Sequence, residues 1–224
     1  MKSHETYKVP KGLKPILLEG TDGHFDPSFE LVKWSLDEAV EAWWSFAQSV
    51  DPRNVVPPVM TPQLGSPKTW LEGFQETSLQ STYVISETKN PQWCFSAPIE
   101  EPRIPGPLHN ALRDGGVARR TEAIQIKYFL DNEAPIVSFR HFDFRVGGQL
   151  RERWVQRFRG KFNSCFHNYI DYEFPGEPSF EGRGWKKFDH EKLYALCMEM
   201  GIDLQDPEFL TGRFVIIDGD VRPK

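Results

Sequence analysis

The sequence has few cysteines, and their arrangement does not indicate a metal or disulfide site. The three cysteines, Cys94, Cys165 and Cys197, are far apart, and no Cys-x-x-Cys pair occurs. An odd number at such spacing argues against a structural zinc site and against a disulfide framework. No apolar run approaches the roughly 20 residues of a membrane span. The N-terminal residues also lack the apolar core of a signal peptide, so we expect a cytoplasmic or otherwise intracellular protein without a membrane partner.

Several catalytic motifs are also missing. The chain contains no glycine-rich phosphate loop, no nucleophile elbow and no Cys-His pair with a familiar spacing. The net charge of −5 excludes a general attraction to nucleic acid or to an anionic membrane. Charge is nevertheless uneven, because residues 113–161 hold eleven lysines and arginines against six aspartates and glutamates. This local excess of positive charge favours an anionic ligand for that region.

The 224 residues are enough for one domain with a substantial core. Ser35-Leu36-Asp37-Glu38 has the pattern of a capping box and predicts a helix start. Asp189 predicts the start of a second helix that Gly201 ends. We expect a single α+β domain over residues 1–224, with a mainly antiparallel sheet of about five to seven strands and both helices packed on one face. Residues 1–15 are predicted to form a loosely ordered arm, and residues 51–67 and 98–107 proline-rich loops.

The longest strand pattern runs through residues 121–162. Residues 121–130 and 136–146 alternate as strands do, and Gly147-Gly148 is a strong hairpin signal. Residues 150–162 fit a period of four as well as a period of two, and the preceding turn favours a strand. Further strands are expected at residues 81–87, 92–97, 166–174 and 214–217. The segment 121–162 therefore predicts the centre of the sheet.

The first functional hypothesis concerns the arginines and aromatics at the end of that segment. Positive side chains attract phosphates, and aromatic rings stack on bases. The candidate ligand-binding residues are Arg151, Arg153, Trp154, Arg157, Phe158, Arg159 and Lys161. Within one strand, however, Trp154 and the arginines alternate to opposite faces. A solvent-facing strand neutralised by Glu122, Glu152 or Glu173 is the competing interpretation.

A second hypothesis is metal-dependent cleavage of a phosphodiester. Gln125-Ile126-Lys127, with Asp114 upstream, is similar to the Q-x-K variant of PD-(D/E)xK nucleases. The resemblance covers only Asp114 to Lys127, and the proline that precedes the aspartate in that family is absent. It implies that Asp114 and Gln125 hold Mg²⁺, while Lys127 steadies the attacking water or the developing charge.

A third hypothesis is an oxygenase. His141-Phe142-Asp143 has the His-x-Asp spacing of two ligands in a facial iron triad. With the strand before it, the motif is similar to that of prolyl-hydroxylase-like enzymes, which implies Fe²⁺ and 2-oxoglutarate as cofactors. His167 and His190 are the later histidines available to complete such a site.

The leading prediction is recognition of a nucleic acid, RNA or DNA, or of another phosphate-bearing ligand by the basic strand pair. Phosphodiester hydrolysis is an optional addition to it. The oxygenase and a non-enzymatic interaction domain are the alternatives. The sequence leaves open whether the protein is an enzyme, what its substrate is and which oligomeric state it adopts.

Overall fold

The structure is a computed structural model, which describes residues 28–50, 63–66, 82–99, 121–129, 136–143, 151–158, 161–167 and 188–218. In these ranges it contains two helices and nine strands. The elements are β1 (Ser28–Val32), α1 (Leu36–Val50), β2 (Gln63–Gly65), β3 (Thr82–Glu87), β4 (Cys94–Ile99), β5 (Glu122–Phe129), β6 (Ile136–Asp143), β7 (Arg151–Phe158), β8 (Lys161–His167), α4 (His190–Glu199) and β9 (Gly212–Asp218). This confirms the mainly antiparallel α+β fold in its broad form.

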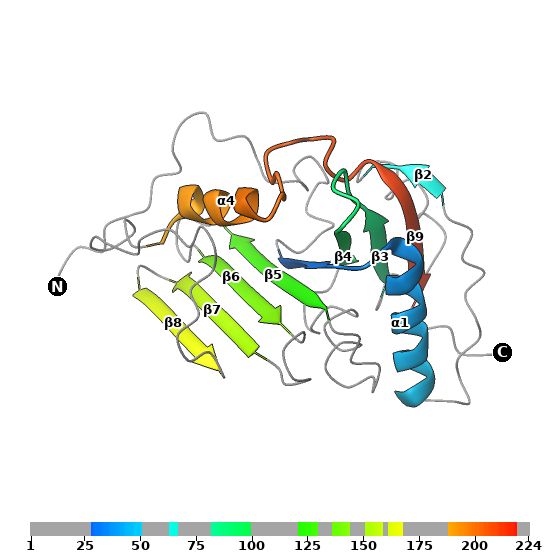
Figure 1. The fold of residues 1–224 in the computed structure, drawn as a ribbon, viewed down its shortest axis with the longest axis horizontal. Coiled ribbons are helices and arrows are strands. Elements are labelled where there is room, and N and C mark those ends of the chain that lie inside the picture. Colours follow the sequence, from blue (N-terminus) through cyan, green and yellow to red (C-terminus); the bar gives the residue numbers. More distant parts are fainter. Residues whose placement is uncertain are drawn as a thin grey trace.

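All nine strands belong to one sheet (Figure 1), in the order β2-β9-β3-β4-β1-β5-β6-β7-β8. Each of the pairings between neighbouring strands is antiparallel. Strands β5 to β8 follow one another as a meander, coloured green to yellow in Figure 1. Because β1 pairs with both β4 and β5, it joins this meander to the half of the sheet that contains β3, β4 and β9.

The segment 150–162 is extended, as predicted, but it contains parts of two strands, β7 and β8, where one strand was expected. Strand β7 ends at Phe158, and β8 begins at Lys161 and pairs back with β7. The expected strand over residues 166–174 overlaps the end of β8 at Phe166 and His167, and residues 168–174 lie outside the described residues.

The helices do not pack on the same face of the sheet. Neighbours in a strand point to opposite faces, and in β3 Val84 belongs to the cluster of buried residues that includes α4, whereas Ile85 belongs to the cluster that includes α1. Helix α1 packs on β3 and α4 packs on β6, and Figure 1 shows the two helices over different parts of the sheet. The prediction of a single helical layer is thus not confirmed. We call the two sides of the sheet the α1 face and the α4 face.

Both predicted helix starts are confirmed by their caps. Ser35 Oγ accepts a hydrogen bond from the Glu38 backbone N–H at 3.3 Å, and the Glu38 carboxylate accepts one from the Ser35 backbone N–H at 2.9 Å. This reciprocal pair is a capping box. In α4, Asp189 Oδ1 accepts from the Lys192 backbone N–H at 3.1 Å. Gly201, with φ +72°, follows the helix end.

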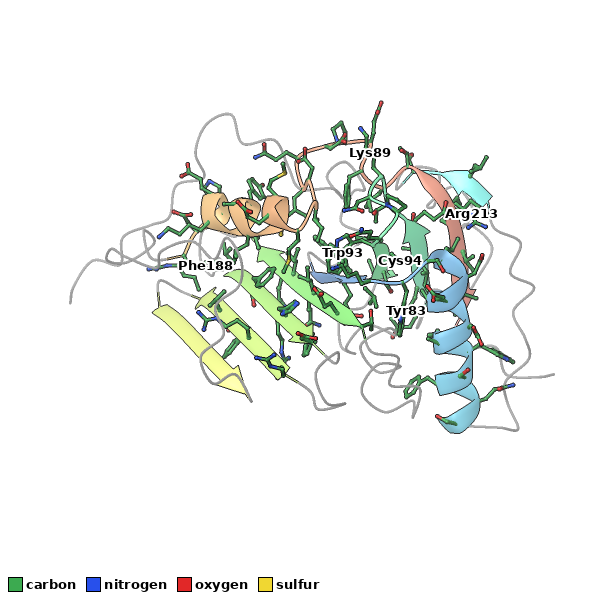
Figure 2. All side chains as sticks on the ribbon, in the orientation of Figure 1. Tyr83, Lys89, Trp93, Cys94, Phe188 and Arg213 are labelled. Atoms are coloured by element: carbon green, nitrogen blue, oxygen red, sulfur yellow. The ribbon has the colours of Figure 1, made fainter. Side chains whose placement is uncertain are left out.

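The C-terminal end of α4 is tied to the turn between β3 and β4. Trp93 Nε1 donates to the Met200 carbonyl at 3.0 Å, and Asn90 Nδ2 donates to the Gly201 carbonyl at 3.0 Å. Figure 2 shows Trp93 beneath this part of the chain, near the centre of the sheet. The helix is therefore fixed over the α4 face at its C-terminal end. Neither of the two helices described is long and apolar enough to cross a membrane.

Candidate functional site

Strand β7 presents its predicted ligand residues to two different faces. Arg153 and Arg157 lie opposite His141 and Val137 of β6, on the α4 face, and they are only 4% and 1% exposed. Arg151 shares that face and is half-buried, whereas Trp154 lies on the α1 face. The expected alternation is confirmed, but the side chains of Arg153 and Arg157 do not form an open positive surface.

Of four other predicted residues, the structure describes two by their backbone pairing and two not at all. Phe158 and Lys161 are register partners where β7 meets β8. Arg159 lies outside the described residues, as does Asp114. The carboxylate of the nuclease-like pattern therefore has no position in this structure.

Arg157 lies close to the start of α4. Burial lowers the pKa of Arg157 from its usual value, and the negative charge of Asp189 opposes that shift. Since Asp189 also caps α4, this attraction links the helix to β7. The position gives Arg157 a structural role in addition to any contact with a ligand.

The α4 face of β5–β7 holds a buried group of ionisable side chains, which we call the charged network: Glu122, His141, Asp143 and Arg153. Each of them is at most 6% exposed. His141 Nε2 and Glu122 Oε2 are 3.4 Å apart. Asp143 lies directly opposite Glu122 on one side, and Arg153 lies directly opposite His141 on the other. Two acids, one histidine and one guanidinium group therefore meet within three adjacent strands.

Lys33, the residue after β1, lies at one end of the charged network, where it contacts Glu122. Lys33 Nζ donates to Glu122 Oε1 at 3.2 Å and lies 5.4 Å from the centre of the Trp93 ring. The backbone N–H of Lys33 donates to the Glu122 carbonyl at 2.9 Å, and Thr121 Oγ1 donates to the Lys33 carbonyl at 2.9 Å. Both oxygens of the Glu122 carboxylate thus face nitrogen atoms of basic residues.

His141 and Asp143 do share a face, as the oxygenase hypothesis requires. Within the ranges that the structure describes, no group of three His, Cys, Asp or Glu side chains is placed to hold a metal ion. One contact of the His141 ring is with Glu122. The iron-dependent oxygenase stays a prediction.

The α1 face of the same strands is polar but more accessible. Its half-buried side chains form what we call the polar patch: Gln125, Lys127, Arg140, Glu152, Trp154 and Gln156. Arg140 lies directly opposite both Gln125 and Trp154. It pairs with Glu152 and lies over the Phe142 ring, 4.9 Å from its centre. Trp154 Nε1 donates to Ser138 Oγ at 3.1 Å, so the indole is held against the sheet.

A carboxylate also lies beside the Q-x-K residues on the α1 face. Glu30 of β1 is directly opposite Gln125 and accepts from Gln125 Nε2 at 3.4 Å. Glu30 is buried, whereas Gln125 and Lys127 are half-buried. Asp114 is thus not the only acidic residue that can accompany this pattern.

The sequence interpretation did not select Glu30, Lys33, Arg140 or Glu122 as site residues, although it named Glu122 as a charge that could neutralise the arginines. For Glu30, Glu122 and Arg140 the one signal in the sequence is an ionisable residue within a strand, which by itself is typical of a solvated face, and Lys33, which follows β1, lacks even that signal. It is the pairing register that places Glu30 and Arg140 beside predicted residues.

Comparison of the chain with protein-family models, with curated proteins and with solved structures finds no match.

Proposed function

We propose that the polar patch on the α1 face of β5–β7 binds a single-stranded nucleic acid. The observation that carries this proposal is the position of Arg140 directly opposite Trp154, with both side chains half-buried. Within β7 the tryptophan and the arginines alternate to opposite faces, which separates stacking from charge. Arg140 of β6 supplies the missing cation on the same face as the ring.

Five of the six side chains of the polar patch, all except Glu152, can contact a part of a nucleotide. Trp154 offers a ring for stacking on a base, and such stacking tolerates any sequence. Arg140 and Lys127 supply positive charge for phosphates. Gln125 and Gln156 can both donate and accept hydrogen bonds, which is the chemistry that reads base edges. A single strand fits this arrangement better than a duplex, because stacking on a side chain requires an unpaired base.

Glu152 opposes the proposed charge, since its carboxylate pairs with Arg140. A bound phosphate would compete with that carboxylate for the guanidinium group. Removing the charge with Glu152→Gln should therefore strengthen oligonucleotide binding, whereas Arg140→Gln should weaken it. Opposite effects of two neighbouring substitutions are a sharper test than a single loss of affinity.

The test is the binding of a fluorescent single-stranded oligonucleotide of about 12 nucleotides, followed by anisotropy at several salt concentrations. The affinity should fall steeply with salt, and Arg140→Gln should reduce the slope of log K against log salt by about 0.7. Trp154→Ala should weaken binding roughly 10-fold, while Trp154→Phe should retain most of it. Arg151→Gln removes a half-buried arginine on the α4 face and is the matched control, for which we expect wild-type affinity. No salt-dependent binding, or equal losses in Arg140→Gln and Arg151→Gln, would reject the proposal.

A metal-assisted cleavage step is a second candidate, which the position of Glu30 beside Gln125 favours. A carboxylate and an amide oxygen are suitable ligands for Mg²⁺, and Lys127 shares their face. The expected result is Mg²⁺-dependent cleavage of the bound oligonucleotide, which Glu30→Gln abolishes without loss of binding. Lys127→Met should also abolish cleavage, with a modest loss of affinity because it removes one positive charge. Cleavage that survives both substitutions would remove this candidate and leave the binding proposal intact.

A further inference from the structure

The side-chain amide of Gln125, in the polar patch, is held in one orientation. Gln125 lies directly opposite Glu30 of β1, whose buried carboxylate accepts a hydrogen bond from Gln125 Nε2 at 3.4 Å. An ionised carboxylate only accepts hydrogen bonds, and in an amide only the nitrogen can donate. If the amide turned over, this bond would be lost and two acceptors would face each other. The nitrogen therefore points toward β1, and the oxygen Oε1 points the other way, toward β6.

The stacking ring of the polar patch lies on the same side as that oxygen. Strand β6 separates β5, which carries Gln125, from β7, which carries Trp154. Trp154 Nε1 donates to Ser138 Oγ of β6 at 3.1 Å, so the indole extends from β7 toward β5. Neighbouring strands are about 4.8 Å apart, so the backbones at Gln125 and Trp154 are about 10 Å apart. A base stacked on the indole is thus within reach of the Gln125 side chain.

The arginine between these two residues leaves the amide oxygen available. Arg140 is directly opposite both Gln125 and Trp154, but its guanidinium group pairs with Glu152 and lies over the Phe142 ring. Among the residues that the structure describes, none donates a hydrogen bond to Gln125 Oε1. Gln125 is also only half-buried. Its amide can therefore contact a ligand without breaking an existing bond.

An amide in a fixed orientation distinguishes between bases. Besides the N–H that faces Glu30, it presents the acceptor Oε1 and a second N–H side by side. Cytosine and adenine complement this pair, because each has an exocyclic amino group that donates and a neighbouring ring nitrogen that accepts. In uracil and thymine a carbonyl oxygen replaces the amino group of cytosine, and in the same stacked position it would face Oε1 as a second acceptor. Only an amide that turned over could accept these bases equally well.

We propose that Gln125, held by Glu30, makes the polar patch prefer single strands of cytosine or adenine to those of uracil or thymine. Gln125 is the residue that contacts the base, and Glu30 is a positioning residue that acts through it. This inference rests on the nucleic-acid binding proposed above. It adds a base preference to a stacking contact that is indifferent to sequence by itself.

The experiment compares the binding of oligo(dC) and oligo(dU) of about 12 nucleotides, followed by fluorescence anisotropy. Cytosine and uracil share one ring and differ at the edge that the amide would contact. A chelator is present, so that no divalent ion occupies the amide oxygen or supports cleavage. The wild-type protein should bind oligo(dC) roughly 10-fold more tightly than oligo(dU), which is within the range for one two-bond contact to a base edge.

Three variants assign this preference to residues. Gln125→Leu removes both hydrogen-bonding groups and should lower the affinity for oligo(dC) to about that for oligo(dU). Glu30→Gln allows the amide of Gln125 to turn over, so the affinity for oligo(dU) should rise toward that for oligo(dC). A substitution that only perturbs the fold would not strengthen binding to one base. Gln92→Leu, at an exposed position in the turn between β3 and β4, is the matched control and should keep the wild-type preference.

The outcomes separate this inference from the proposed function. Binding of neither oligonucleotide would reject the proposed function and the inference together. Equal affinities in the wild type, tighter binding of oligo(dU), or a preference that persists in Gln125→Leu would overturn the base preference and leave the binding proposal intact. An unchanged preference in Glu30→Gln would overturn the role of Glu30.

Should Glu30→Gln fail to fold, NMR of the wild-type protein decides the role of Glu30. One of the two side-chain amide protons of Gln125 should then exchange with water more slowly than the other, because only one of them is bonded to the carboxylate. Equal exchange of the two protons would reject the fixed orientation. The comparison of wild type with Gln125→Leu still decides the base preference.

Discussion

The two faces of strands β5–β7 carry ionisable residues of the same types under very different conditions. On the α4 face, Arg153 and Glu122 are almost fully buried, and Glu122 contacts both Lys33 and His141. On the α1 face, Arg140 and Glu152 pair with each other while the arginine side chain stays 38% exposed. The two faces thus carry similar types of residue, but these residues are buried on the α4 face and partly exposed on the α1 face. A count of charges along the sequence adds both faces together and hides this difference.

The largest predicted effect compares one carboxylate on each face. Glu122→Gln removes a buried charge that contacts both Lys33 and His141. Breaking such a group by removing one partner costs about 3–5 kcal/mol. Glu152→Gln removes the partner of Arg140 on the half-buried face, and pairs of this kind contribute less than about 1 kcal/mol. The free energy of unfolding of both variants can be measured in urea at neutral pH.

Equal losses of stability in the two variants would contradict the claim that the carboxylate on the buried face contributes more to stability than the one on the half-buried face. The salt dependence of stability gives an independent check, because a buried pair is screened less than an exposed one. The difference in unfolding free energy between wild type and Glu122→Gln should therefore change little between low and high salt. That between wild type and Glu152→Gln should shrink.

The sequence predicted local features well because they depend on a few neighbouring residues. The capping box at Ser35 and the cap at Asp189 are each complete within four residues, and both exist in the structure. The alternation of Arg151, Arg153 and Arg157 on one face is also local and is confirmed. It says which residues share a face, but not what covers that face.

Features that depend on distant parts of the chain were not predictable in the same way. Strand β1 has only five residues, with the acidic Glu30 at its centre, and it becomes a central strand because both of its edges are paired. The same holds for Arg140, whose place beside Trp154 follows from the register of β6 with β7. The burial of Arg157 reflects the approach of a helix that begins at His190.

The next prediction compares the caps of the two helices. Ser35→Ala should cost about 1 kcal/mol, the usual value for loss of an N-cap side chain. Asp189→Ala should cost more, about 2–3 kcal/mol, because it also removes the carboxylate that attracts the buried Arg157. Asp189→Asn separates the two contributions, since asparagine caps helices as well as aspartate does. Chemical unfolding of the three variants gives the comparison, and a loss in Asp189→Asn close to zero would show that the charge contributes nothing.

The smallest predicted effect concerns pH. It tests whether a histidine of α4 makes the stability of the protein depend on pH. His190 at the start of α4 is buried against Tyr194, with ring centres 6.0 Å apart. Burial lowers the pKa of His190 below its usual value of 6.5, although Asp189 and Glu191 oppose this shift. Between the lowered pKa and 6.5, the unfolded chain binds more protons than the folded chain does. The stability that His190 contributes is therefore complete above pH 6.5 and is lost as pH falls, by at most about 1.4 kcal/mol per pH unit for one proton.

The measurement is the melting temperature of wild type and His190→Gln between pH 5 and pH 8. Glutamine does not titrate, so the variant should lose less stability than wild type on the acidic side, and the two curves should run parallel above pH 7. Curves that stay parallel over the whole range, including the acidic side, would mean that His190 adds no pH dependence to the stability of the protein.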